Sequence, residues 1–234
     1  MGRAIVLELA RRGCDVVVHC MTSRAEAESC AAEARGMGVS AEVVRADLGT
    51  GSGVETLAEA VLARGRLDVL VHSASVYGPT PTATVTAEEL VRQYRVNAVA
   101  PLVLTVRLAG LLGASGLAGG GAVLAMSDIH VLARPRKDFT AYSMSKAALT
   151  QMVECLARDL APRVRVNAVA PGVVAFPEAG YESGEAMQQA YLARVPLARS
   201  GTPEDAARAV AYLALDAGYV TGEVLRVDGG RWLA

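Results

Sequence analysis

The sequence predicts a single α/β domain spanning residues 1–234, with a parallel sheet covered by helices on both faces. Short runs rich in Val, Leu and Ala alternate with segments whose apolar residues recur at helical spacing. The apolar runs are nearly continuous, which is typical of strands buried on both faces. No repeat, low-complexity stretch or linker divides the chain. This alternation is that of a doubly wound fold.

The first predicted element is a helix that begins at Gly2 and ends at Gly13, a residue suited to terminate it. A β-rich run at Cys14–Cys20 predicts a buried strand. The next helix covers Ser23–Arg35 and ends in the turn Gly36–Gly38. The remaining strands are predicted at 40–46, 67–72, 122–127, 164–170 and 223–227. The remaining helices are predicted at 54–64, 87–112, around Tyr142, at 185–194 and at 203–215.

One feature departs from the usual order of such a sheet. A doubly wound nucleotide-binding sheet starts with a strand and a glycine-rich turn, and the turn feeds a helix whose N-terminus holds a pyrophosphate. Here the chain starts inside that helix. We therefore expect a sheet whose first strand and glycine-rich turn are missing, as in an N-terminally truncated protein.

Composition excludes several classes of protein. The 234 residues are 52% hydrophobic and 20% charged, which suits one compact domain. A net charge of −1 provides no general attraction to nucleic acid or to an anionic membrane. No run of eighteen apolar residues and no signal peptide is present, so we expect a cytoplasmic protein.

The four cysteines form no C-x-x-C pair and have no histidine at a spacing suited to zinc. We expect neither disulfides nor a metal site. Buried free thiols are the better interpretation of Cys14, Cys20, Cys30 and Cys155.

A catalytic pair is suggested by Tyr142 and Lys146, which are four residues apart on a predicted helix. Side chains at this spacing are neighbours, so the lysine charge is expected to lower the tyrosine pKa. A tyrosine tuned in this way can donate a proton in a reaction.

With this pair, the order of the other motifs makes the chain resemble the short-chain dehydrogenase/reductase family from Gly2 to Gly230. Each motif lies at the end of the element where the family has it. They are Asp47-Leu48, Ser73-Ala74-Ser75, Val96-Asn97, Tyr142 with Lys146, Asn167 to Gly172, Thr221-Gly222 and Val227 to Gly230.

Within that family the chain looks most like the bacterial pteridine reductases. Asp128 matches the position where most relatives carry a catalytic serine, and Ser127 is the alternative if the loop aligns differently. Tyr77 matches an aromatic residue that stacks on the pterin ring. Arg134-Pro135 and Phe176-Pro177-Glu178 also resemble segments of this group.

The resemblance implies a role for each matching residue. Tyr142 would donate the proton, Lys146 would also hold the nicotinamide ribose, and Asn97 would position a water that links Lys146 to solvent. Asp128 would bind the donor or the pterin, and Ser75 and Tyr77 would contact the substrate. The remaining cofactor contacts would be Asp47, Leu48, Ser73, Ala74, Ser75, Pro171, Gly172 and Val174.

Cofactor choice is set after the strand Cys14–Cys20, where an acidic residue would accept the ribose hydroxyls of NAD. The stretch from His19 to Arg24 contains no acid. We therefore predict NADPH, with His19, Ser23 and Arg24 near its 2′-phosphate.

The predicted reaction is hydride transfer from NADPH to a C=N bond of a dihydropterin or dihydrofolate. Two alternatives remain open, a carbonyl reductase that acts on a 3-oxoacyl thioester or another ketone, and a non-catalytic paralogue that uses the fold for binding or assembly. The C-terminal segment Val227 to Gly230 resembles the part through which the family forms tetramers, so a homotetramer is expected.

Overall fold

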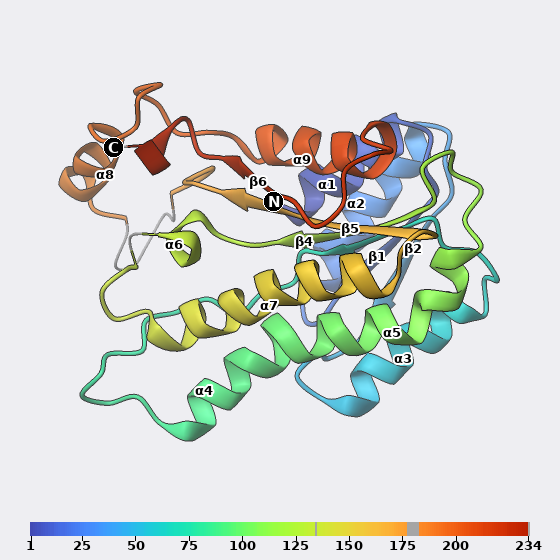
Figure 1. Ribbon diagram of the computed structural model, residues 1–234, viewed down its shortest axis with the longest axis horizontal. Coiled ribbons are helices and arrows are strands. Elements are labelled where there is room, and N and C mark those ends of the chain that lie inside the picture. The colour runs from blue at the N-terminus through green and yellow to red at the C-terminus, as the bar shows by residue number, and fades with distance from the viewer. Residues whose placement is uncertain (134, 177–182, 234) are drawn as a thin grey trace.

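The computed structural model describes residues 1–133, 135–176 and 183–233, in which helices cover both faces of parallel strands (Figure 1). The strands are β1 (Val16–Cys20), β2 (Ala41–Arg45), β3 (Val69–His72), β4 (Gly121–Met126), β5 (Val164–Pro171) and β6 (Val224–Val227). The α-helices are α1 (Gly2–Arg11), α2 (Arg24–Gly36), α3 (Gly51–Leu62), α4 (Ala87–Tyr94), α5 (Ala100–Gly113), α6 (Ile129–Leu132), α7 (Thr140–Asp159), α8 (Glu185–Leu192) and α9 (Pro203–Ala211).

The strands confirm the predicted parallel α/β architecture, but they form two ladders. One sheet contains β1 and β2, and the other has the order β3-β4-β5-β6. Among the described residues no strand joins β1 to β3, so the two ladders are separate. The central strands β4 and β5 are buried along their whole length, whereas β1 and β3 are only half-buried.

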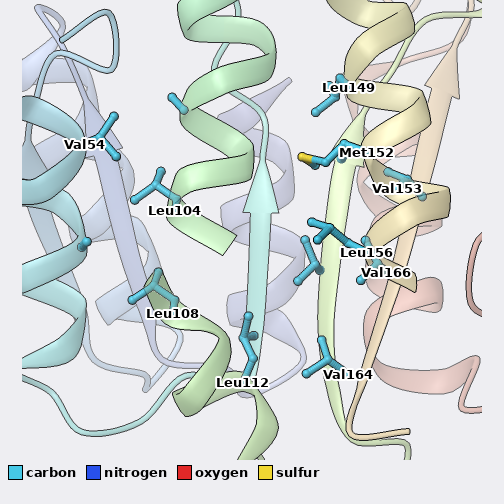
Figure 2. Packing of buried hydrophobic residues seen from close by; sticks show 14 of the residues in the cluster. Val54, Leu104, Leu108, Leu112, Leu149, Met152, Val153, Leu156, Val164 and Val166 are labelled. Atoms are coloured by element: carbon cyan, nitrogen blue, oxygen red, sulfur yellow. The ribbon is translucent and has the colours of Figure 1, made fainter. Parts of the chain in front are cut away.

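The larger core fills the space between one face of the sheets and helices α3, α5 and α7 (Figure 2). Leu104, Leu108 and Leu112 recur along α5 and point into this core, opposite Val153 of α7 and Val166 of β5. All five side chains are at most 3% exposed. This spacing of one apolar residue per helical turn explains why the segment is a helix packed on a sheet.

On the opposite face, helix α1 packs across both sheets. Ile5 and Leu9 belong to a cluster with α9 and β4, and Ala10 belongs to a second cluster with α2 and β1. Helices on the two faces therefore span the interruption between the ladders, and side-chain packing supplies the cohesion that backbone hydrogen bonds supply within each sheet.

The predicted helix 87–112 is a helix, but its turns are not uniform. Helices α4 and α5 are joined by a π-helical turn, η1 (Arg95–Val99), which contains the buried Asn97. By length and composition alone this helix could cross a membrane. Its buried face packs on the sheet instead, as a core helix does. A π turn has no simple sequence pattern and often marks a functional position.

A second π turn, η2 (Tyr212–Asp216), and a 3-10 turn, η3 (Arg231–Leu233), follow near the C-terminus. The guanidinium of Arg165, from the amino end of β5, caps the end of η2. It donates hydrogen bonds to the carbonyl oxygens of Leu213, Ala214 and Ala217 at 2.6–3.0 Å, and to that of Gly119 at 3.0 Å. The side chain is buried, and these acceptors replace the water that it loses.

All four cysteines are free thiols. Cys20 and Cys30 are buried and Cys14 is half-buried. The expectation of burial is wrong for Cys155, which lies on the exposed side of α7.

Candidate active site

The predicted site residues gather at the carboxyl ends of the strands, where loops leave a parallel sheet. Asp47 follows β2, Ser73 follows β3, Asp128 follows β4, and Pro171 ends β5. Helix α7 runs back from this edge and places Tyr142 in its first turn.

Tyr142 and Asp128 form the centre of the site. The Tyr142 hydroxyl donates a hydrogen bond to Asp128 Oδ2 at 3.1 Å. Only 8% of Tyr142 is exposed. A phenol and a carboxylate therefore share one hydrogen bond at the edge of the core, 14 residues apart in the chain.

Lys146 lies one turn further along α7 and is 3% exposed. Its ammonium donates a hydrogen bond to the Met126 carbonyl oxygen at 2.8 Å and lies 5.9 Å from the centre of the Tyr142 ring. Burial lowers the pKa of Lys146 to about 8, while the nearby Asp128 carboxylate acts in the opposite direction.

The expectation that Tyr142 has a lowered pKa is wrong for this arrangement. Burial raises the pKa of Tyr142 strongly, and the charge and hydrogen bond of Asp128 raise it further. An acceptor that holds the phenol proton favours the neutral form. At neutral pH Tyr142 is consequently a protonated phenol, which can act as a proton donor.

Local structure explains why Asp128 faces the site. It caps the short helix α6, accepting a hydrogen bond from the His130 amide at 2.8 Å through Oδ1, which leaves Oδ2 for Tyr142. The sequence predicts only a polar loop here, because a four-residue helix has no periodic pattern to detect. An Asp, a residue that often caps a helix, is its only signal.

Ser127 is turned away from the site. Its hydroxyl lies 2.7 Å from Thr150 Oγ1, and the Thr150 hydroxyl donates to the Lys146 carbonyl oxygen. The Ser127 proton must therefore be donated to Thr150. Of the two aligned candidates, only Asp128 touches Tyr142.

An aromatic wall borders Tyr142. The Tyr77 ring stacks on Phe139 with centroids 4.9 Å apart and meets the Tyr142 ring edge-on at 4.8 Å. Arg136 Nη1 donates a hydrogen bond to the Tyr77 hydroxyl at 2.6 Å. Tyr77 is 45% exposed, so an aromatic surface remains accessible beside the phenol.

A second group of aromatic side chains, around Tyr191, was not predicted from the sequence. Tyr191 of α8 accepts a hydrogen bond from the Val173 amide at 3.3 Å, and its ring lies 6.3 Å from His130 and 6.0 Å from Phe176. The guanidinium of the buried Arg231 lies 5.3 Å from the centre of the same ring. A tyrosine on a short polar helix offers no sequence signal for this role.

Asn97 supports the loop after β3. Its Oδ1 accepts hydrogen bonds from the Val76 amide at 2.8 Å and the Ser75 hydroxyl at 3.1 Å. Its Nδ2 donates to the Val76 carbonyl oxygen and to Ser145 Oγ, both at 2.9 Å. Among the described residues no hydrogen bond of this side chain reaches Lys146. Asn97 thus positions Ser75 and the loop that leads to Tyr77.

His72, just before Ser73 and Ala74, is a structural residue. Its Nε2 lies 2.8 Å from Thr105 Oγ1, and Thr105 donates to the Pro101 carbonyl oxygen. Burial, and secondarily the charge of Lys146, lower the pKa of His72 to about 4. The imidazole is neutral at physiological pH and donates through Nε2.

Of the residues predicted for the adenosine end, Asp47 lies in a cavity of about 640 Å³. Asp47 lines it and accepts a hydrogen bond from the Gly49 amide at 2.8 Å, and the adjacent Leu48 is buried. His19, predicted near the 2′-phosphate, instead has Nε2 2.9 Å from the Ala46 carbonyl oxygen. It holds the ends of β1 and β2 together.

Arg24 and Ser23 do not line this cavity. Ser23 precedes α2 and its side chain makes no capping hydrogen bond. Arg24 lies in the first turn of α2 with a 68% exposed side chain, 3.8 Å from Glu28. Arg45, which the sequence did not single out, lines the cavity with Thr22.

Two glycines lie in close contacts near the predicted cofactor positions. A Cβ built on Gly2, the first residue of α1, would lie 3.5 Å from Ser73 Oγ. A Cβ built on Gly172 would lie 3.1 Å from Asp228 Cα, and the neighbouring Val174 is buried. Arg134, Pro177 and Glu178 lie outside the described residues.

Comparison with known proteins agrees with this geometry. The protein family described as enoyl-(acyl carrier protein) reductase matches residues 1–231. An uncharacterized oxidoreductase of Methylorubrum extorquens is 38% identical, with 98% of this chain and 92% of the relative covered. Tetrahydroxynaphthalene reductase of Pyricularia oryzae is 32% identical, with 98% of this chain and 85% of the relative covered.

Solved structures share the fold as well. The crystal structure of acetoin dehydrogenase from Enterobacter cloacae superimposes with a TM-score of 0.87 at 30% identity, and the match covers 99% of this chain and 91% of that structure.

Proposed function

The chain belongs to the short-chain dehydrogenase/reductase family of oxidoreductases, and from this premise we propose an NADPH-dependent reductase of the pteridine reductase kind. It would reduce a C=N bond in a flat heterocycle of the dihydropterin or dihydrofolate class. The observation that carries the proposal is the hydrogen bond from Tyr142 to Asp128, beside the accessible ring of Tyr77.

The reduction adds a hydride and a proton across the C=N bond. Bound NADPH would supply the hydride. Tyr142 would supply the proton, because its raised pKa keeps the phenol protonated at neutral pH. Lys146 would hold a positive charge behind the phenol and hydrogen-bond the nicotinamide ribose.

Asp128 favours a substrate that carries N–H groups. Once Tyr142 has given up its proton, a phenolate lies beside the Asp128 carboxylate, and two adjacent negative charges oppose each other. A ring that donates hydrogen bonds to Asp128 relieves this repulsion. A ketone would instead place a developing oxyanion next to the carboxylate, where a serine hydroxyl would stabilise it better.

Tyr77 favours a flat ring for a separate reason. One of its faces is covered by Phe139 and its edge meets Tyr142. The remaining aromatic surface can stack on a planar heterocycle and hold it in position for the proton transfer.

The assay is oxidation of NADPH with dihydrobiopterin, dihydrofolate and a panel of ketones that includes acetoin. We expect the heterocycles to be the better substrates and Tyr142→Phe to abolish their reduction. Ser127→Ala is the matched control beside Asp128, and it should retain activity because Ser127 bonds to Thr150 and not to Tyr142. Undiminished activity of Tyr142→Phe would refute the assignment.

A ketone reductase is the second candidate, because relatives include proteins named tetrahydroxynaphthalene reductase and acetoin dehydrogenase. Asp128→Ser separates the two functions. For a heterocycle reductase this variant should lose activity with pterins and gain activity with ketones. If the protein is a ketone reductase, the unaltered protein should already reduce the ketones of the panel faster than the heterocycles.

The two remaining proposals concern binding and assembly. A non-catalytic paralogue would bind NADPH without oxidising it in any of these assays. A homotetramer is supported by the position of β6 at the end of the order β3-β4-β5-β6, which leaves its outer edge without a neighbour in that sheet. Light scattering after size-exclusion chromatography measures the assembly.

A further inference from the structure

The loop after β1 is where a cofactor of this type is distinguished at its adenosine ribose. This loop contains Met21, Thr22 and Ser23, and no acidic residue. Two arginines lie near enough in the fold to compete for the role of phosphate ligand. Their side chains point in different directions.

Arg24 does not line the cavity. It begins α2, its side chain is 68% exposed, and its nearest described carboxylate is that of Glu28 at 3.8 Å, one helical turn on. Pairs of this kind on helix surfaces are weakly ordered. Nothing in the geometry directs the Arg24 guanidinium toward the loop after β1.

Arg45 points across the loop. It is the last residue of β2, in register with Cys20 at the end of β1. Its Nε donates a hydrogen bond to the Met21 carbonyl oxygen at 3.0 Å, which fixes the guanidinium next to Thr22. Among the described residues no carboxylate forms an ion pair with Arg45, so its terminal nitrogens are available to an anion.

The cavity beside Arg45 has the size and chemistry of a nucleotide site. Its volume of about 640 Å³ suits an adenosine bearing a phosphate. Arg45 is the one cation in its lining, which also includes the hydroxyls of Thr22, Ser52 and Thr56 and the carboxylate of Asp47. Asp47 can accept a hydrogen bond from an adenine amino group, and the cation and hydroxyls can bind a phosphate.

We propose that Arg45, and not Arg24, is the residue that binds the 2′-phosphate of the cofactor and sets the preference for NADPH. This inference rests on the NADPH part of the proposed function and is independent of the substrate. Because β2 supplies the cation and the loop after β1 supplies the hydroxyl, the phosphate site is formed between two strand ends.

The test measures binding of two fragments, 2′,5′-ADP and 5′-AMP, by calorimetry, so no substrate or turnover is needed. Arg45→Met keeps the apolar stem and removes the guanidinium, and it should weaken 2′,5′-ADP by roughly 10- to 100-fold, the range for a hydrogen bond to a charged group. Its affinity for 5′-AMP should stay unchanged. Arg24→Met, the matched control, should change neither affinity by more than about threefold, as for a surface pair.

Arg45→Lys keeps the charge but loses the bond to Met21, and an intermediate affinity is expected. Circular dichroism checks that each variant is folded. Equal weakening of both fragments by Arg45→Met would mean that Arg45 supports the adenosine pocket as a whole, and it would overturn the inference. A selective loss in Arg24→Met would do the same.

Failure of the inference and failure of the proposed cofactor are distinguishable. If the unaltered protein binds 2′,5′-ADP no more tightly than 5′-AMP, both the NADPH assignment and the role of Arg45 fail. If it prefers 2′,5′-ADP and Arg45→Met retains that preference, only the role of Arg45 fails. Neither result depends on whether a pterin or a ketone is reduced.

Discussion

Lys146→Met should make the protein more stable at neutral pH while abolishing reduction. The ammonium is 3% exposed and its one described hydrogen bond goes to the Met126 carbonyl oxygen. Its pKa falls from 10.5 to about 8 in the folded protein. This difference corresponds to about 3 kcal/mol of unfavourable free energy for the charged form. Loss of the hydrogen bond costs about 1 kcal/mol, so the net gain in unfolding free energy is about 2 kcal/mol.

The gain in unfolding free energy from Lys146→Met should decrease as the pH rises. The folded pKa of Lys146 lies below the unfolded one, so between about pH 8 and pH 10.5 the unfolded chain binds more protons. The free energy of unfolding of the unaltered protein therefore rises with pH through this window, relative to the variant. Below about pH 8 the full gain of Lys146→Met is present, and it disappears as pH approaches 10.5.

Urea unfolding followed by circular dichroism, near pH 7 and near pH 10, measures both quantities. The chain has only two lysines, so Lys137→Met is a natural control. Lys137 is exposed, and this change should stay within about 0.5 kcal/mol, as for most surface substitutions. A Lys146→Met variant less stable than the unaltered protein near pH 7, or a gain that persists near pH 10, would refute the reasoning.

Three other perturbations have defined outcomes. Reduction should slow above about pH 8 as Lys146 loses its charge, and a pH profile that is flat to pH 10 would contradict this. Arg165→Met should lower the unfolding free energy by roughly 3 kcal/mol or more in urea melts, because buried carbonyl oxygens lose their donor. A higher unfolding free energy in the variant would show that the cost of desolvating Arg165 outweighs its hydrogen bonds. Backbone amides of β1 and β3 should exchange with deuterium faster than those of β4, since each lies beside the interruption between the sheets. Equal protection would mean that the strand edges are covered in solution.

The elements of the fold could be predicted because their signals are local. Strand β4 is a continuous apolar run and is completely buried, as such a run predicts. Strand β5 is also completely buried, although Arg165 and Asn167 interrupt its apolar residues. The π turn at Asn97 and the four-residue helix α6 could not be predicted, because neither changes the hydrophobic period over a detectable length.

The proximity of Tyr142 and Lys146 could be predicted from the sequence, but the pKa of Tyr142 could not. Tyr142 and Lys146 are neighbours in sequence, so their proximity follows from the helix. The pKa of Tyr142 depends instead on burial and on Asp128, which comes from another element. Helix spacing brings Lys146 near Tyr142, but burial and Asp128 outweigh the effect of the lysine on the tyrosine pKa.

Cofactor residues show the same limit. Position along the chain predicts His19, near the end of β1, and Ser23 and Arg24, which follow β1. A parallel sheet, however, brings the end of β2 beside the end of β1, and Arg45 reaches the loop from there. A whole crossover separates Arg45 from β1 in the sequence, so its position beside this loop is not visible along the chain.

The contact between Asp128 and Tyr142 also bears on the direction of the reaction. A tyrosine that must act as a base in alcohol oxidation needs a pKa low enough to lose its proton, and a serine neighbour does not oppose that loss. The Asp128 carboxylate does oppose it, because it accepts the phenol proton and repels the phenolate. Tyr142 is therefore held protonated at neutral pH, in the state that donates a proton and does not remove one.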